Sequence, residues 1–195
     1  MANVNRPHGL APVRHINGSP WNGQVEHFSV LASDNTALFV GDAVISAGTA
    51  DATGRQCITR AANTSTARVI GVIVGFDADP TNLNRPSQYR LASTARTALV
   101  CVDPTVLYEI QADGTTANAA AAVGLNAPLV LTAGSTITGI SAMELNIDAA
   151  ATNTTLPLKI VGAVQTPDND YTETTNVKYL VLLNTSTLNT GTEGV

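Results

Sequence analysis

The sequence has few charged residues and few aromatic residues. Charged residues make up 13% and aromatic residues 4% of its 195 residues, and the net charge is −5. An average soluble protein is about one quarter charged, so small uncharged side chains must cover much of this protein's surface. The sequence contains no cluster of lysine and arginine that could neutralise a row of phosphates. We therefore predict no direct contact with nucleic acid.

Long hydrophobic runs are also missing. The longest clean apolar run is VIGVIVGF at 69–76, far shorter than the ~20 residues that a membrane-spanning helix needs. The opening MANVNRPHGL has neither the basic nor the apolar region of a secretory signal. We predict no membrane segment and a cytosol-like compartment, where Cys57 and Cys101 remain thiols in the protein core.

Sequence motifs for catalysis are absent as well. The chain contains no G-x-S-x-G nucleophile motif and no glycine-rich phosphate-binding motif. His8, His15 and His27 all lie near the start of the chain, while Asp77-Ala78-Asp79 and Asp168-Asn169-Asp170 lack the glycine and distal glutamate of a calcium loop and predict solvated turns. We predict no catalytic residue, no metal site and no cofactor. A hydrolase that uses His27 and an acid is the last-ranked alternative.

Short β-strands dominate the rest of the sequence. Alternating or β-branched segments recur at spacings of about 8–12 residues, which is typical of all-β sandwiches and barrels. These segments are 25–32, 37–48, 55–61, 68–76, 96–103, 105–111, 127–133, 136–146, 155–165 and 177–184. The fold class predicted is mainly β, a single antiparallel β-sandwich or barrel, with a jelly roll left open.

One alanine-rich segment predicts a short helix near 116–123. Thr115 or Thr116 would cap its start, and Gly124 would end it. No strand–helix–strand alternation accompanies this helix, which argues against a parallel α/β fold.

The stretch RPHGLAPVRHINGSPWNG, at 6–23, fits neither a strand nor a helix period. It holds three prolines, three glycines and no acidic residue. We predict three parts: an extended N-terminal arm at 1–24, a β domain at 25–184 and a polar C-terminal tail at 185–195. Ordering ~20 arm residues costs on the order of 1–2 kcal/mol each, so such an arm needs a partner. The candidate contact residues are Arg6, Leu10, Arg14 and Trp21. Trp21 is either a docking anchor or a lid that folds back on its own domain.

The arm, together with VGDAV, VIGVIVGF, ALVCVDPTVLYEIQADG and AAVGLNAPLVL, resembles the structural cement, or decoration, proteins of tailed bacteriophage capsids. The resemblance extends from about residue 5 to residue 183. It implies a mainly β protein on the exterior of the virion, assembled in the host cytoplasm, which bridges neighbouring major capsid proteins as a dimer or trimer. It implies no catalytic residues.

A carbohydrate-binding or adhesive β-sandwich module of a virion is the alternative function. The threonine and asparagine content and the paired acidic residues favour this alternative. The shortage of aromatic rings for sugar stacking counts against it.

Overall fold

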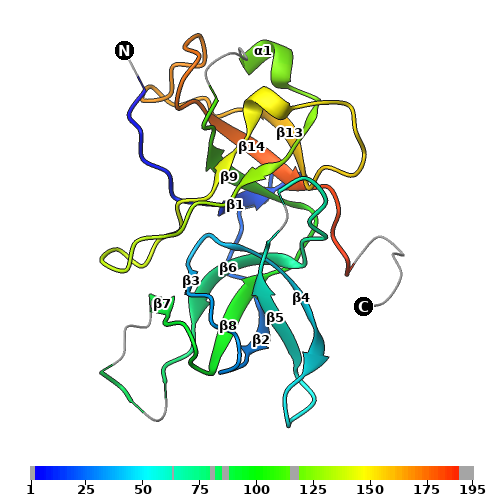
Figure 1. Ribbon diagram of the computed structural model, residues 1–195. Helices are drawn as coiled ribbons and strands as arrows, with labels where there is room; N and C mark the ends of the chain where they lie inside the picture. The colour runs from blue at the N-terminus through cyan, green and yellow to red at the C-terminus, as the bar shows by residue number, and fades with distance from the viewer. Residues whose placement is uncertain (1–2, 63, 80–81, 85–87, 115–118, 189–195) are drawn as a thin grey trace.

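The computed structural model describes residues 3–62, 64–79, 82–84, 88–114 and 119–188. Within these ranges the strands form a five-stranded sheet, a closed barrel and two small two-stranded sheets (Figure 1). The predicted mainly β fold is confirmed. The arrangement combines a barrel with an open sheet, stacked one above the other in the view of Figure 1.

The closed barrel has the strand order β2-β5-β4-β6-β8. Its strands are β2 (Glu26–Val30), β5 (Gln56–Arg60), β4 (Ala43–Ala50), β6 (Gly71–Phe76) and β8 (Arg96–Cys101). All neighbours are antiparallel except β2 and β5, which pair in parallel through Ser29 and Cys57. Apolar side chains from these strands fill the interior, among them Phe28, Ile58 and Ile73. Closure removes the free edges of this sheet.

The five-stranded sheet has the order β1-β9-β14-β13-β10, and its pairings are antiparallel. Its strands are β1 (Ala11–His15), β9 (Val106–Gln111), β14 (Lys178–Leu183), β13 (Leu158–Ala163) and β10 (Asn126–Ala127). One face carries a larger core cluster that includes Tyr108, Ile160 and Val181. The cluster also contains Val72 and Cys101 of the barrel strands, so apolar packing joins the two sheets.

Short elements complete the described structure. They are β3 (Leu38–Phe39), paired with β7 (Tyr89–Arg90); β11 (Leu129–Val130), paired with β12 (Glu144–Leu145); the helix α1 (Ala119–Ala122); and the 3-10 turn η1 (Ile147–Ala149). Gly124 follows α1 with a φ of 89°, as expected for a helix-ending glycine. The two proposed cap residues, Thr115 and Thr116, lie outside the described residues. No described helix has the length and hydrophobicity to cross a membrane.

Both predicted thiols are confirmed. Cys57 and Cys101 are free and buried. The Tyr108 hydroxyl lies 3.2 Å from both the Cys101 carbonyl oxygen and its sulfur. Burial raises the pKa of the Cys101 thiol, so this cysteine behaves as a small core residue.

The predicted boundary at residue 24 needs correction. The N-terminal segment is extended, but it is not separate from the β domain, because β1 forms the edge of the five-stranded sheet beside β9. Leu10 belongs to the larger core cluster. The pairing of β1 with β9 shifts register between Pro12 and Arg14, and this irregularity hides the strand period in the sequence.

The boundary at residue 185 is also crossed by contacts. The Thr185 hydroxyl donates to the Ala67 carbonyl oxygen at 2.7 Å, and Ser186 is buried. Residues 189–195 of the predicted tail lie outside the described residues.

Candidate functional site

The N-terminal segment runs between the barrel and the five-stranded sheet. The Arg6 backbone N–H donates to the Gln111 side chain at 2.8 Å, and the Leu10 N–H donates to the Gly41 carbonyl at 2.9 Å. Gly9 has a φ of 69°, and a Cβ there would lie 2.7 Å from the Ser141 Cβ. Only glycine fits this crossing. The segment is therefore held by the folded chain itself.

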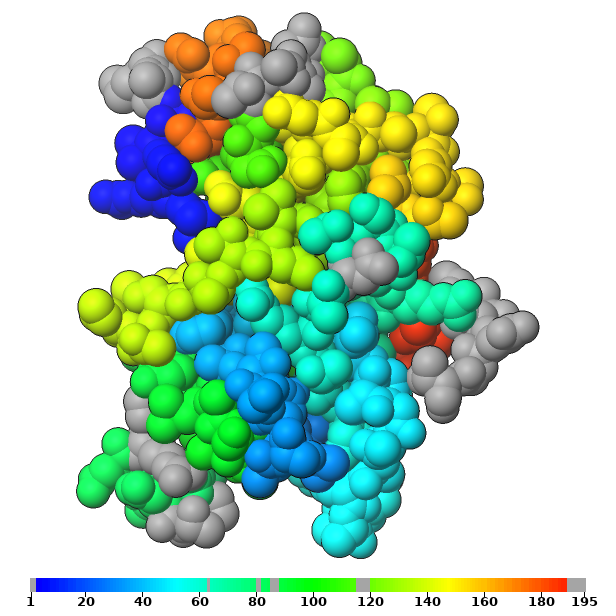
Figure 2. All heavy atoms as spheres, in the orientation of Figure 1, coloured from blue at the N-terminus to red at the C-terminus, as the bar shows by residue number. Residues whose placement is uncertain are grey.

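Two cavities flank this segment. The first, of about 470 Å³, is mainly apolar and lies between the segment and strand β6. Its lining includes Pro12, Val13, Trp21, Val74 and Ile140. The second, of about 700 Å³, lies between residues 6–8 and residues 133–142. His8 and Ile140 line both cavities. Figure 2 shows the corresponding hollow between the blue N-terminal segment and the projecting yellow-green loop.

Charged groups form a short chain beside the first cavity. The His8 Nε2 lies 3.5 Å from Glu109 Oε1, and Lys178 Nζ lies 3.8 Å from that same oxygen. Lys178 Nζ also lies 2.8 Å from Asp168. Contact with His8, together with the Lys178 charge, holds the pKa of Glu109 below its ordinary value despite partial burial. These side chains therefore place both acidic and basic groups on the surface beside the first cavity.

The four predicted contact residues are not equivalent in the structure. Leu10 is 1% exposed and part of the core, so the prediction that it contacts a partner is wrong for this fold. Arg6 lines the second cavity and is exposed, and Arg14 is partly exposed within β1. Trp21 packs against the larger core cluster and lines the first cavity. Of the two interpretations of Trp21, the structure therefore favours the one that folds back on its own domain.

Each histidine has a carboxylate neighbour. His8 faces Glu109, His15 lies 3.4 Å from Asp103, and His27 lies 3.9 Å from Asp77. The His15 and His27 contacts occur at partly exposed positions, where ion pairs contribute little. Among the described residues, no group of three or more His, Cys, Asp or Glu side chains could hold a metal ion.

The Asp168-Asn169-Asp170 turn has a structural role that the sequence does not indicate. The buried Asn169 amide donates to the Val164 and Lys178 carbonyl oxygens at 2.8 and 3.0 Å, and its oxygen accepts from the Lys178 N–H at 2.8 Å. These contacts fasten the loop between β13 and β14. The sequence predicts a solvated turn, but the central residue of this turn is buried.

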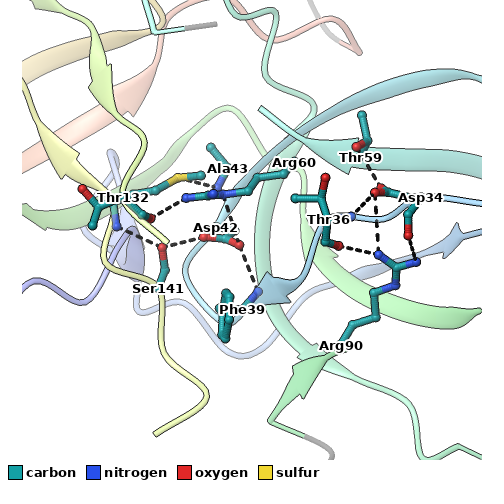
Figure 3. Close-up of polar contacts among 11 residues, drawn as sticks. Asp34, Thr36, Phe39, Asp42, Ala43, Thr59, Arg60, Arg90, Thr132 and Ser141 are labelled. Carbon is teal, nitrogen blue, oxygen red and sulfur yellow. Dashed lines mark hydrogen bonds and ion pairs between the residues drawn. The ribbon is translucent and has the colours of Figure 1, made fainter. Parts of the chain in front are cut away.

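Two buried charged groups hold loops against the barrel (Figure 3). Asp42 accepts from the Ser141 hydroxyl at 2.6 Å and from the Phe39 N–H at 2.9 Å, and Arg60 lies 3.7 Å away. Burial raises the pKa of Asp42, although the Ser141 hydrogen bond and the Arg60 charge oppose this. The Gly41-Asp42 break between two strands is visible in the sequence, but its partner Ser141 is not.

The second group is Arg90. Its guanidinium donates to the Leu31 and Asp34 carbonyls at 2.7 Å, to the Thr36 carbonyl at 2.5 Å and to the Thr94 carbonyl at 2.7 Å. Asp34 provides a carboxylate at 3.7 Å. Arg90 therefore fixes two loops at one end of the barrel and is fully buried.

A third cavity lies at one end of the barrel. Its volume is about 480 Å³, and its lining includes Ser29, Asp51, Arg55, Arg96 and Thr97. Hydrogen bonds from Ser29, Thr53 and the Arg55 backbone hold the pKa of Asp51 far below its ordinary value. The polar groups around Asp51 therefore hydrogen-bond to one another.

The sequence and the structure were compared with known protein families, curated proteins and solved structures. No protein-family model, no curated protein and no solved structure matches this chain.

Proposed function

We propose that this protein is a capsid cement protein, which binds the exterior of a tailed-phage shell and bridges neighbouring major capsid proteins. The observation that carries the proposal is the distribution of exposed apolar side chains. Leu83 is 78% exposed in the loop that follows β6, and Tyr171 is 48% exposed in the loop that precedes β14. Figure 1 places these two loops at opposite ends of the protein. A bridging protein needs contact surfaces that are separated in this way.

The interior of the protein suits a bridge under tension. Backbone pairing closes the barrel, and the larger core cluster extends from the five-stranded sheet into the barrel strands. Asp42 and Arg90 fasten the connecting loops from inside. A load applied at one end therefore passes through packed side chains rather than through a linker. The repetition of modest contacts over many copies gives a large total effect.

The resemblance to decoration proteins supports the same proposal. The segments that carry it include β6, β8, β9 and the N-terminal segment. In the structure these elements lie together at the junction of barrel and sheet. The resemblance therefore covers the structural framework, and the exposed loops supply the contacts.

The experiment compares phage particles that carry the protein with particles from which it has been stripped. Decorated particles should rupture at a higher temperature, and adding the pure protein back should restore that temperature. Leu83→Ser and Tyr171→Ser should each reduce retention on particles while leaving the fold intact. Thr172→Ala, beside Tyr171, is the matched control. Failure of the pure protein to sediment with the particles would show that the proposal is wrong.

Glycan binding is the second candidate, and the cavity at the barrel end is the observation that favours it. Carboxylates, arginines and hydroxyls line this cavity, and such groups bind sugar hydroxyls. It ranks second because its described lining has no aromatic ring for stacking. Calorimetric titration with the host's surface polysaccharide tests it: heat of binding that is lost in Asp51→Asn would favour this function over the first.

A further inference from the structure

The chain stretch that joins the sheet strand β1 to the barrel strand β2 contains two asparagine–glycine pairs, Asn17-Gly18 and Asn22-Gly23. Asparagine followed by glycine is chemically reactive, because the backbone nitrogen of the glycine can attack the side-chain carbonyl carbon of the asparagine. Glycine has no Cβ to hinder this attack, and its backbone adopts many conformations. Both asparagines are exposed to water. The local sequences therefore predict similar reactivity, and the fold decides any difference.

Asn17 lies in a tight turn that holds the attacking nitrogen. The Gly18 N–H donates to the His15 carbonyl oxygen at 2.9 Å, and the His15 N–H donates to the Ser19 carbonyl oxygen at 2.8 Å. The Asn17 side-chain oxygen accepts from the Ser19 N–H at 3.0 Å and from the Ser19 hydroxyl at 2.6 Å. Attack by the Gly18 nitrogen requires loss of the proton that it donates to His15, and rotation of the Asn17 side chain. The turn opposes both changes.

Asn22 lies in a stretch without this constraint. Residues 21–25 belong to no strand, helix or turn. Within the described part of the chain, the Gly23 N–H and the Asn22 side-chain amide have no hydrogen-bond partner, and only the Asn22 backbone N–H is bonded, to the Gln24 side-chain oxygen at 3.1 Å. A Cβ added at Gly23 would meet no atom within 4 Å. The attacking nitrogen is therefore free, and there is room for a ring to form and for water to reach it.

We propose that Asn22 is a site of spontaneous covalent modification, at which the side-chain amide is converted into aspartate and isoaspartate, and that the turn protects Asn17. The Gly23 nitrogen gives its proton to a base in the solvent and forms a bond to the Asn22 side-chain carbonyl carbon. The bond from that carbon to the side-chain nitrogen breaks, and this nitrogen takes up a proton and leaves as ammonia. Water then opens the cyclic imide. Opening at the side-chain carbon gives aspartate, and opening at the backbone carbon gives isoaspartate.

The product changes the charge of the N-terminal segment. Residues 6–25 contain two arginines and no acidic residue, so the reaction introduces their first carboxylate. Isoaspartate also lengthens the backbone by one methylene, between Trp21, which packs against the larger core cluster, and the barrel strand β2. The reaction needs neither a partner nor a capsid, so this proposal holds or fails independently of the proposed function.

Peptide mass spectrometry of the full-length protein provides the test. The folded protein is kept in mildly alkaline buffer, sampled over time and digested at mildly acidic pH, which slows the reaction. Fragmentation assigns the mass gained when OH replaces NH₂ to Asn17 or to Asn22, and it detects isoaspartate. Asn22 should react roughly tenfold or more faster than Asn17, because the hydrogen bonds of the turn must open first. A rate at Asn17 that equals or exceeds the rate at Asn22 would overturn the proposal, as would no reaction at Asn22.

Two controls separate the effect of the fold from the effect of the local sequence. In guanidinium chloride the turn is lost, so the two asparagines should react at similar rates. A preference for Asn22 that persists unchanged in the unfolded chain would contradict the protection by the turn. Asn22→Gln should abolish the mass gain at this position and leave the slow gain at Asn17 unaltered. Because Asn22 is exposed, this variant should unfold at the wild-type temperature.

Discussion

Asp42 and Arg90 beside the barrel are completely buried, whereas Glu109 and Lys178 beside the five-stranded sheet are partly exposed. The barrel charges bond to loop backbone and hydroxyl groups. The sheet charges bond mainly to one another across the surface. Exposed ion pairs are worth about 0–1 kcal/mol, while removing one partner from a buried charged network costs about 3–5 kcal/mol. The buried charges of the barrel are therefore expected to contribute strongly to the stability of the fold, and the exposed charges of the sheet only weakly.

Buried apolar contacts, rather than charges, stabilise the sheet. Removing its N-terminal edge strand β1 should therefore reduce the stability of the protein more than any other change. Deleting residues 1–24 removes β1 and the core residue Leu10. We expect the truncated chain to lose its cooperative unfolding transition, measured by calorimetry. The single change Leu10→Ala should cost about 2–5 kcal/mol, whereas Val4→Ser at an exposed position should change little. A truncated chain with a wild-type transition would restore the interpretation of a separate arm.

The barrel charge Arg90 should give the next largest effect. Arg90→Ala leaves the carbonyls of Leu31, Asp34, Thr36 and Thr94 without their donor. We expect a loss of about 3–5 kcal/mol in the free energy of unfolding, measured by urea denaturation. The exposed Arg55→Ala is the control, expected within about 0.5 kcal/mol. Equal losses for the two variants would contradict the comparison.

Asp42 should make stability depend on pH. Its pKa is raised in the folded state, so the folded chain keeps a proton that the unfolded chain loses above about its ordinary value of 3.8. Stability therefore falls as the pH rises from that value to the raised pKa. In Asp42→Asn this part of the pH dependence should disappear in denaturation curves recorded across that interval. An unchanged profile would show that another group titrates there.

The smallest effect belongs to the surface charges of the sheet. The Lys178 ammonium, together with a hydrogen bond from the Thr166 side chain, lowers the pKa of Asp168 to about 2. In Lys178→Ala, the Asp168 pKa should rise toward its ordinary value of 3.8, as measured by NMR titration. Because the folded pKa is depressed, the stabilisation is present above the ordinary value and is lost as the pH falls toward about 2. Lys159→Ala, on the neighbouring strand β13, should leave the Asp168 pKa unchanged.

The segments that form the main strands could be predicted from sequence because their periodicity is local. The expected segment at 37–48 divides at Gly41-Asp42 into β3 and β4. The edge strand β1 has no clear signal in the sequence, since Pro12 and the register shift beside it interrupt the alternation. The two-residue strands β7 and β10 exist through their partners and have no local signal of their own.

The candidate surface could be predicted only in part. Arg6 is exposed and Arg14 is partly exposed in the structure, whereas Leu10 is core. Exposure of an apolar side chain depends on what packs over it, which spacing in the sequence does not specify. Ile137 belongs to a segment that the sequence predicts to be a strand, and it instead projects from a loop held by Ser135 and Val40.

By itself, the sequence determined the class of fold, the short helix and the uncharged character of the surface, because each follows from residue type and local period. Only the tertiary structure decided that the strands divide into a barrel and a sheet, and that Leu10 and Trp21 pack against their own domain. It also decided that Asp42 meets Ser141, 99 residues away. These outcomes depend on contacts between segments that are far apart in the chain. The sequence of one such segment does not indicate which other segment it will pack against.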